Sequence, residues 1–195
     1  MSLTKYINVK KNKEILKIIK NFELLDILDK KNVFHNLVNQ GIKTLSNNGK
    51  IILFGNGGSA SDAQHLATEL TVRYKKNRKA LAAISLATDT STLTAIGNDF
   101  SFEEIFSRQI EAICTKKDLA IGITTSGNSK NIIKAVRQCY KQKIPVYILS
   151  GNNGGNIKKI TKNIIPFPKT STSHVQTMQI FIGQLFCEIM EERLT

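Results

Sequence analysis

Apolar and polar positions alternate along this chain in blocks that favour an α/β fold. Short apolar runs bounded by polar or glycine-rich segments are typical of buried strands, and they occur at 51–55, 82–86, 119–124, 146–150 and 164–167. Between these runs, apolar residues recur at helical spacing. Strands that alternate with helices predict a parallel sheet with helices on both faces and all carboxyl ends at one edge. We therefore predict a three-layer α/β domain built on a five-stranded parallel sheet.

Helical spacing also extends beyond the sheet at both ends. Two helices are expected between residues 12 and 45, and a closing helix over 173–192. Residues 1–48 are assigned to N-terminal helices that pack on the core or on a partner subunit. Residues 49–195 form the ligand-binding part of what is a single domain overall, because 195 residues suit one buried core.

Composition narrows the function classes. Hydrophobic residues make up 41% and charged residues 22%, which is ordinary for a folded domain. No apolar run reaches the roughly 18 residues of a membrane span, and the Lys-rich N-terminus has no signal-peptide core. We therefore expect a cytoplasmic protein that does not associate with a membrane. The net charge is +13, but the lysines are dispersed, so nucleic acid is the minority interpretation. The three cysteines predict buried, reduced thiols: Cys114, Cys139 and Cys187.

Two glycine-rich loops follow strands directly. The first, Gly55-Asn56-Gly57-Gly58-Ser59, opens a helix, where unpaired backbone N–H groups and the helix dipole favour an anion. The second carries four hydroxyl groups around a Gly-Asn turn, on Thr124, Thr125, Ser126 and Ser129. One such turn is often a capped helix start. Two at one sheet edge predict a phosphorylated ligand between them.

Candidate chemistry lies on two helices. His65 and Glu69 are four residues apart on the helix after the first loop, so they share a face. Their spacing suits joint metal ligation, or a carboxylate base beside an imidazole that moves protons. Gln176 and Gln184 are about two turns apart on the closing helix and also share a face. Taken alone, either pair would more often lie on a solvated surface than in a site. The start of the first helix at the glycine-rich loop favours a functional role for His65 and Glu69.

Several ordered motifs together resemble the sugar isomerase (SIS) domain family and, more narrowly, its phosphoheptose isomerases. Beside the two loops, the motifs that carry the resemblance are Asp62-Ala63-Gln64-His65, Glu69-Leu70, Arg73-Tyr74, Gly97-Asn98-Asp99-Phe100 and Phe106-Ser107-Arg108-Gln109. The resemblance covers nearly the whole chain. It implies an aldose–ketose isomerase that converts sedoheptulose 7-phosphate to D-glycero-D-manno-heptose 7-phosphate, the first step of nucleotide-activated heptose synthesis for glycans such as lipopolysaccharide. It also implies a homotetramer with sites near subunit boundaries.

The resemblance assigns roles to individual residues. It implies that Glu69 and His65 carry the proton transfers through an enediol, with Glu69 as the base on carbon. It implies that the other matching residues bind substrate: Asn56, Gly57, Gly58 and Ser59 in the first loop, Asn98 and Asp99 on sugar hydroxyls, Thr124, Thr125, Ser126 and Ser129 on the phosphate, and Gln176.

The resemblance breaks at one metal ligand. Metal-binding members of the family use His and Glu on one helix and Gln and His on the last, and His65, Glu69 and Gln176 match three of them. The fourth position is Gln184 here. An amide does not titrate, and its carbonyl is a weaker zinc ligand than imidazole. We therefore expect one zinc ion per subunit, held with reduced affinity, or reduced catalysis.

Other functions use the same fold. It also resembles a non-catalytic bacterial protein that binds the replication initiator and regulates DNA replication, and Gln184 points in that direction. The retained Asp62, Glu69 and glycine turn point to the isomerase. A phosphosugar-sensing SIS protein would add a DNA-binding segment, and nothing before Asn12 resembles one.

Overall fold

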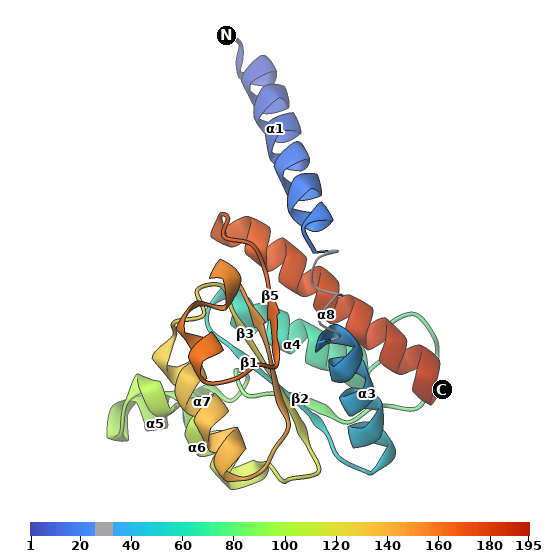
Figure 1. Ribbon diagram of the computed structural model, residues 1–195, viewed down its shortest axis with the longest axis vertical. Helices are drawn as coiled ribbons and strands as arrows, with labels where there is room; N and C mark the ends of the chain where they lie inside the picture. The colour runs from blue at the N-terminus through green and yellow to red at the C-terminus, as the bar shows by residue number, and fades with distance from the viewer. Residues whose placement is uncertain (26–32) are drawn as a thin grey trace.

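The computed structural model describes residues 1–25 and 33–195 and has the predicted three-layer α/β architecture (Figure 1). Its sheet has five parallel strands in the order β2-β1-β3-β4-β5. The three inner strands keep their predicted bounds: β1 Ile51–Gly55, β3 Leu119–Thr124 and β4 Val146–Ser150. The edge strands β2 (Ala83–Ser85) and β5 (Ile164–Pro166) are shorter than the apolar runs predicted, because each pairs with only one neighbour.

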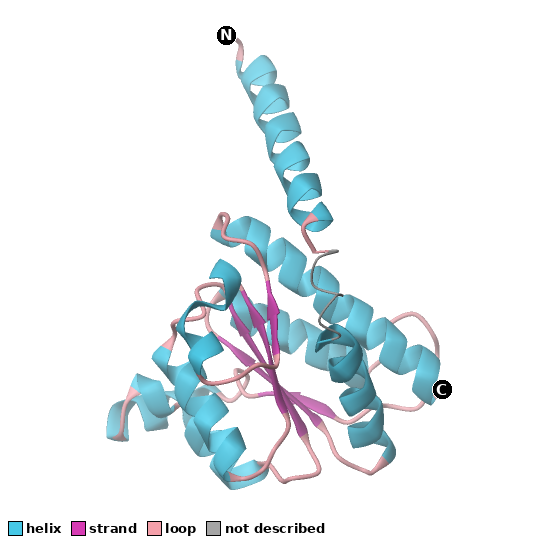
Figure 2. Ribbon diagram, in the orientation of Figure 1, coloured by secondary structure: helices cyan, strands magenta, loops and turns pink. Residues whose placement is uncertain are grey.

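Side chains of successive strand residues point to opposite faces of the sheet and so divide the core in two. Ile51 and Leu53 lie in one cluster with residues of α3 (Val33–Ser46), α4 (Gly58–Thr71) and α8 (Thr172–Leu194). Ile52 and Phe54 lie in the other cluster, on the face covered by α5 (Thr90–Asp99), η1 (Phe102–Glu104), α6 (Ser107–Ile113), α7 (Lys130–Lys141) and η2 (Asn152–Lys159). Figure 2 shows the sheet between these two helical layers.

The N-terminal helix α1 (Leu3–Glu23) projects from this body (Figure 1). It starts well before the predicted residue 12, because the Ser2 side chain caps it by accepting from the Lys5 backbone N–H at 3.4 Å. None of its residues is buried. An edge-to-face contact between Phe22 and Phe181, with ring centroids 5.1 Å apart, joins it to α8. The part of the predicted N-terminal helical region at 26–32 lies outside the described residues.

Two further expectations concern the described residues. Cys114, Cys139 and Cys187 are all buried free thiols, as predicted. Among the helices of residues 1–25 and 33–195, none is long and apolar enough to cross a membrane.

Candidate active site

The strand order identifies the edge at which a ligand binds. After β1 the chain moves to β2 on one side, whereas β3, β4 and β5 follow on the other side. In open parallel sheets, ligands bind outside the carboxyl ends of strands where the order reverses in this way. The loops that follow β1 and β3 flank this point. The two predicted phosphate loops are therefore neighbours at one edge of the sheet, as predicted from the sequence.

A reciprocal pair of amides joins the two loops. Asn56 follows β1, and Asn131 lies in the first turn of α7, 75 residues later. Each side-chain nitrogen donates to the other side-chain oxygen, at 2.9 and 2.8 Å. Asn131 is 3% exposed and Asn56 is half-buried, so the pair is partly sheltered from water. The amides hold the starts of α4 and α7 in a fixed relation. Asn131 was not predicted from the sequence, where it is one of many Asn residues.

The first loop turns on glycine. Gly57 has φ +55°, in the left-handed region that glycine adopts readily, and it caps α4 without any side-chain hydrogen bond. A Cβ on Gly58 would overlap the side-chain nitrogen of Gln176 and lie 2.9 Å from its Cδ. Gln176 of α8 therefore lies against this loop, as its predicted role requires. Ser59, at 3% exposure, is buried behind the turn.

The hydroxyl groups of the second loop have separate tasks. Thr124 Oγ1 accepts from the Gly127 N–H at 3.2 Å, and Ser126 Oγ accepts from the Asn128 N–H at 3.1 Å, so both brace the turn. Ser129 is the N-cap residue of α7, yet its hydroxyl makes no capping hydrogen bond. Thr125 is half-buried. The loop is thus preformed, with hydroxyl and backbone donors at one helix start.

A third loop supports the second from behind. Four consecutive residues, 152–155, have positive φ angles between 45° and 91°. This left-handed path brings the Asn156 N–H to Asn128 Oδ1 at 2.9 Å and the Ile157 N–H to the Gly127 carbonyl at 3.0 Å. A Cβ on Gly155 would lie 2.9 Å from Asn128 Oδ1, which leaves no room for a larger residue. These contacts fix the backbone of the hydroxyl-rich turn.

His65 and Glu69 meet on the exposed side of α4. His65 Nε2 lies 2.9 Å from Glu69 Oε1, and their side chains are 50% and 18% exposed. Glu69 is thus mostly sheltered, whereas the imidazole reaches solvent. Asp62 lies one turn before His65, with Oδ2 buried and without a partner among the described residues. Burial raises the pKa of Asp62, and the charge of a protonated His65 opposes this rise.

Helix α8 runs beside α4 in the same direction. Gln176 contacts Gly58 near the start of both helices. Further along, Gly183 packs against Leu66 so closely that a Cβ on Gly183 would lie 2.9 Å from Leu66 Cδ2. The neighbouring Gln184 is half-buried and makes no hydrogen bond within the described ranges. Both glutamines therefore lie on α8, which runs alongside α4, and Gln176 lies at its start beside the first loop.

Asn98 and Asp99 are not brought to the two loops within one chain. They end α5, where both are exposed, and Asn98 Nδ2 donates to Asp99 Oδ1 at 2.8 Å. The neighbouring Phe100 ring lies under the Arg108 guanidinium, 3.7 Å from it. Their predicted contact with sugar hydroxyls stays a prediction.

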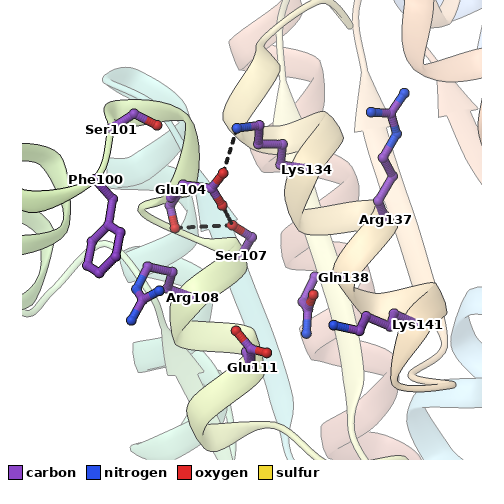
Figure 3. A pocket seen from close by; sticks show the side chains of 10 residues that line it. All are labelled: Phe100, Ser101, Glu104, Ser107, Arg108, Glu111, Lys134, Arg137, Gln138 and Lys141. Carbon is purple, nitrogen blue, oxygen red and sulfur yellow. Dashed lines mark hydrogen bonds and ion pairs between the residues drawn. The ribbon is translucent and has the colours of Figure 1, made fainter.

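A large hollow lies away from the strand ends. It measures about 630 Å³ and opens between α6 and α7, where the Lys134–Glu104 ion pair closes one end (Figure 3). Its lining carries both signs of charge, including Arg108, Glu111 and Lys141. None of the predicted site residues lines it. The candidate site lies instead at the loops that follow the strand ends, where the strand order reverses.

The donor atoms decide how well this site suits a metal ion. In the described residues, no group of three or more His, Cys, Asp or Glu side chains is arranged to hold one. His65 and Glu69 supply an imidazole and a carboxylate, so further ligands would be the amide oxygens of Gln176 and Gln184. Amide oxygens bind zinc less strongly than imidazole, so these donor types suit only a weakly held zinc ion. The Gln176 amide lies at Gly58, about 10 Å along the helix axis from His65, so the meeting of these donors at one ion stays a prediction.

Comparisons with known proteins point to one family. The family model described as SIS domain matches residues 25–151. A phosphoheptose isomerase of Helicobacter pylori is 51% identical over 150 residues, which cover 77% of this chain and 78% of that protein. That of Paramagnetospirillum magneticum is 49% identical over 158 residues, covering 81% and 82%. The structure of the Neisseria gonorrhoeae phosphoheptose isomerase matches with a TM-score of 0.88 and 33% identity, over 95% of this chain and 99% of that chain.

These similarities distinguish between the functions that the sequence left open. Each of the three relatives is a phosphoheptose isomerase, which favours the enzyme over the initiator-binding protein. The match to the solved structure extends over both helical layers and the sheet. The chain therefore belongs to the SIS domain family and, within it, to the phosphoheptose isomerases, a group of sugar phosphate isomerases.

Proposed function

We propose that this chain interconverts sedoheptulose 7-phosphate and D-glycero-D-manno-heptose 7-phosphate. The observation that carries the proposal is the arrangement of two phosphate-type loops at the switch point of the sheet, with a His–Glu pair along α4. His65 follows Gly58 by seven residues, about 10 Å along the helix axis. The Glu69 carboxylate leans back one turn to reach His65. If the phosphate binds at the loops and the proton transfers occur at His65 and Glu69, the sugar must bind in an extended form to span this distance.

The proposed reaction is an isomerisation: protons move between C1, C2 and their oxygens, and the composition of the sugar stays the same. The Glu69 carboxylate takes a proton from C1 of the ketose, and the C–H electrons form the carbon–carbon double bond of an enediol as the oxygen on C2 is protonated. Removal of the proton from the oxygen on C1 and return of a proton to C2 then give the aldose. His65, or a water beside it, carries the transfers at the oxygens. The preformed loop at 124–129 holds the phosphate throughout.

We also propose that one zinc ion per subunit binds weakly to His65 and Glu69, with Gln176 and Gln184 as amide ligands. A bound zinc ion would polarise the sugar oxygens. Because Gln184 offers a carbonyl oxygen, we expect a chelator to remove the ion easily. The same four side chains also suit direct hydrogen bonding to an enediol, so activity is expected to persist in part without metal.

We further propose that the chain forms a homotetramer in the cytoplasm and that its product is used in lipopolysaccharide synthesis. The support for self-association is α1, which exposes Leu3, Ile7 and Ile15 at 73%, 52% and 47% and buries no residue. A second copy would cover this apolar surface. Size measurement by light scattering tests it, and a monomer at micromolar concentration contradicts it.

Incubation of the purified protein with sedoheptulose 7-phosphate, with and without a chelator, tests the activity. We expect the heptose 7-phosphate to form, and Glu69→Gln to reduce turnover by about 10²- to 10⁴-fold, as expected for loss of a general base. Glu188→Gln is the matched control, because Glu188 lies on α8 in an exposed ion pair with Lys75. Near wild-type turnover in Glu69→Gln would remove this carboxylate from the mechanism, and an inactive wild-type protein would refute the function.

A further inference from the structure

A buried arginine closes the end of the helix that carries Glu69. Arg78 follows α4 in the chain, and its side chain is 1% exposed. Its two terminal nitrogens donate to the carbonyls of Glu69 at 2.8 Å and Leu70 at 2.9 Å. These carbonyls lie in the last turn of α4, where a helix leaves its C=O groups without intrahelical donors. Arg78 therefore binds the turn to which Glu69 belongs.

A carboxylate on α8 holds this arginine in turn. Glu191 Oε2 accepts from Arg78 Nε at 2.9 Å, and the Glu191 side chain is only 2% exposed. The same carboxylate accepts from the backbone N–H groups of Tyr74, Lys75 and Lys76 at 2.7 to 2.9 Å. Burial alone would raise the pKa of Glu191, but these donors bring it to about 2. The carboxylate is thus charged and fully hydrogen-bonded, which a buried ion pair requires.

We infer that Arg78, held by Glu191, is a positioning residue for the Glu69 carboxylate, an inference that rests on the proposed function. The path from arginine to base is short. Arg78 fixes the backbone of Glu69 itself, and the Glu69 side chain reaches from that backbone to His65 at 2.9 Å. Displacement of the last turn of α4 moves the carboxylate relative to a sugar held by the loops. Because misplacement by about 1 Å costs on the order of 100-fold in rate, the arrangement matters for chemistry more than for binding.

Arg78→Lys tests the inference by keeping a positive charge beside Glu191 while removing the two donors to the helix end. We expect kcat to fall about 10- to 100-fold. KM is expected to stay within about twofold, because the phosphate loops at β1 and β3 do not touch Arg78. Glu191→Gln weakens the hold on Arg78 and is expected to give the same split with a smaller loss of kcat. It carries the test if Arg78→Lys does not fold.

The matched control removes a different link between the same two segments. Lys75→Met deletes the exposed ion pair with Glu188, but its backbone N–H still donates to Glu191. Both kcat and KM should stay within about twofold of wild type. The kcat of each variant is normalised to its folded fraction. A folded Arg78→Lys protein with wild-type kcat, or a loss of kcat no larger than the loss of folded protein, would overturn the inference.

Failure of the proposed function has a different signature, because the wild-type protein is then inactive on sedoheptulose 7-phosphate. Hydrogen exchange still decides the positioning in that case. Faster exchange of residues 66–72 in Arg78→Lys than in wild type and Lys75→Met supports it, and unchanged exchange overturns it.

Discussion

Gly58→Ala separates the role of the first loop in catalysis from its role in folding. The added Cβ would lie 2.9 Å from Gln176 Cδ, about 0.5 Å inside an ordinary contact of 3.4 Å, and would overlap the side-chain nitrogen. The flexible glutamine therefore swings out, at a cost of about 1 kcal/mol for a strained rotamer. Alanine in the first turn of α4 gains up to about 1 kcal/mol over glycine. Stability should change by less than about 1 kcal/mol, because the two effects oppose each other.

Turnover should fall far more than stability. If Gln176 contributes to the site, its displacement is expected to reduce kcat/KM by about 10- to 100-fold. Thermal unfolding followed by circular dichroism measures the first quantity, and the isomerase assay measures the second. The decisive comparison is a double-mutant cycle with Gln176→Ala. Gly58→Ala should cost little further activity in that background, because the two changes act on one contact. Full additivity of the two losses, or wild-type activity in Gly58→Ala, would refute the reasoning.

Three further perturbations test other contacts. Asn131→Leu removes both hydrogen bonds to Asn56 and is expected to lower the free energy of unfolding by about 1–3 kcal/mol, measured by urea denaturation; an unchanged midpoint contradicts the role of the amide pair. The pKa of Glu191 falls from 4.5 to about 2 on folding, so its stabilisation of about 3 kcal/mol is present above pH 4.5 and lost as the pH falls toward 2; Glu191→Gln should flatten this acid dependence of unfolding. Deletion of residues 1–23 also removes the Phe22–Phe181 contact and the Glu14–His174 ion pair; the core should still unfold cooperatively, but light scattering should show fewer subunits in the assembly, and an unchanged number of subunits would exclude α1 from the interface.

Much of the fold could be predicted because the signals are local. The apolar runs of β1, β3 and β4 gave their bounds directly, since both faces of an inner strand are buried. The edge strands were predicted too long, because composition does not reveal which strands lack a second neighbour. The start of α1 was missed although Leu3, Tyr6 and Ile7 have helical spacing, because these residues are exposed on a helix that the core does not cover, and Ser2 caps its start.

The candidate site divides in the same way. The loops at Gly57 and Thr124 and the pair His65–Glu69 were predictable, because each is a short motif with its own chemistry. The amide pair of Asn56 and Asn131 was not, since its members are 75 residues apart. The hold of Glu191 on Arg78 spans 113 residues, and neither residue stands out in the sequence.

The sequence by itself determined the elements and the chemistry available to them: apolar runs specify strands, glycine permits the turn at Gly57, and helical spacing sets His65 beside Glu69. Tertiary structure alone decided which of these segments meet. The order of the strands places the two loops at one switch point, and the packing of α8 on α4 brings Gln176 to Gly58 and Glu191 to Arg78. The reason is physical: local patterns are fixed by neighbouring residues along the chain, whereas such contacts form only when the burial of two apolar clusters brings distant segments together.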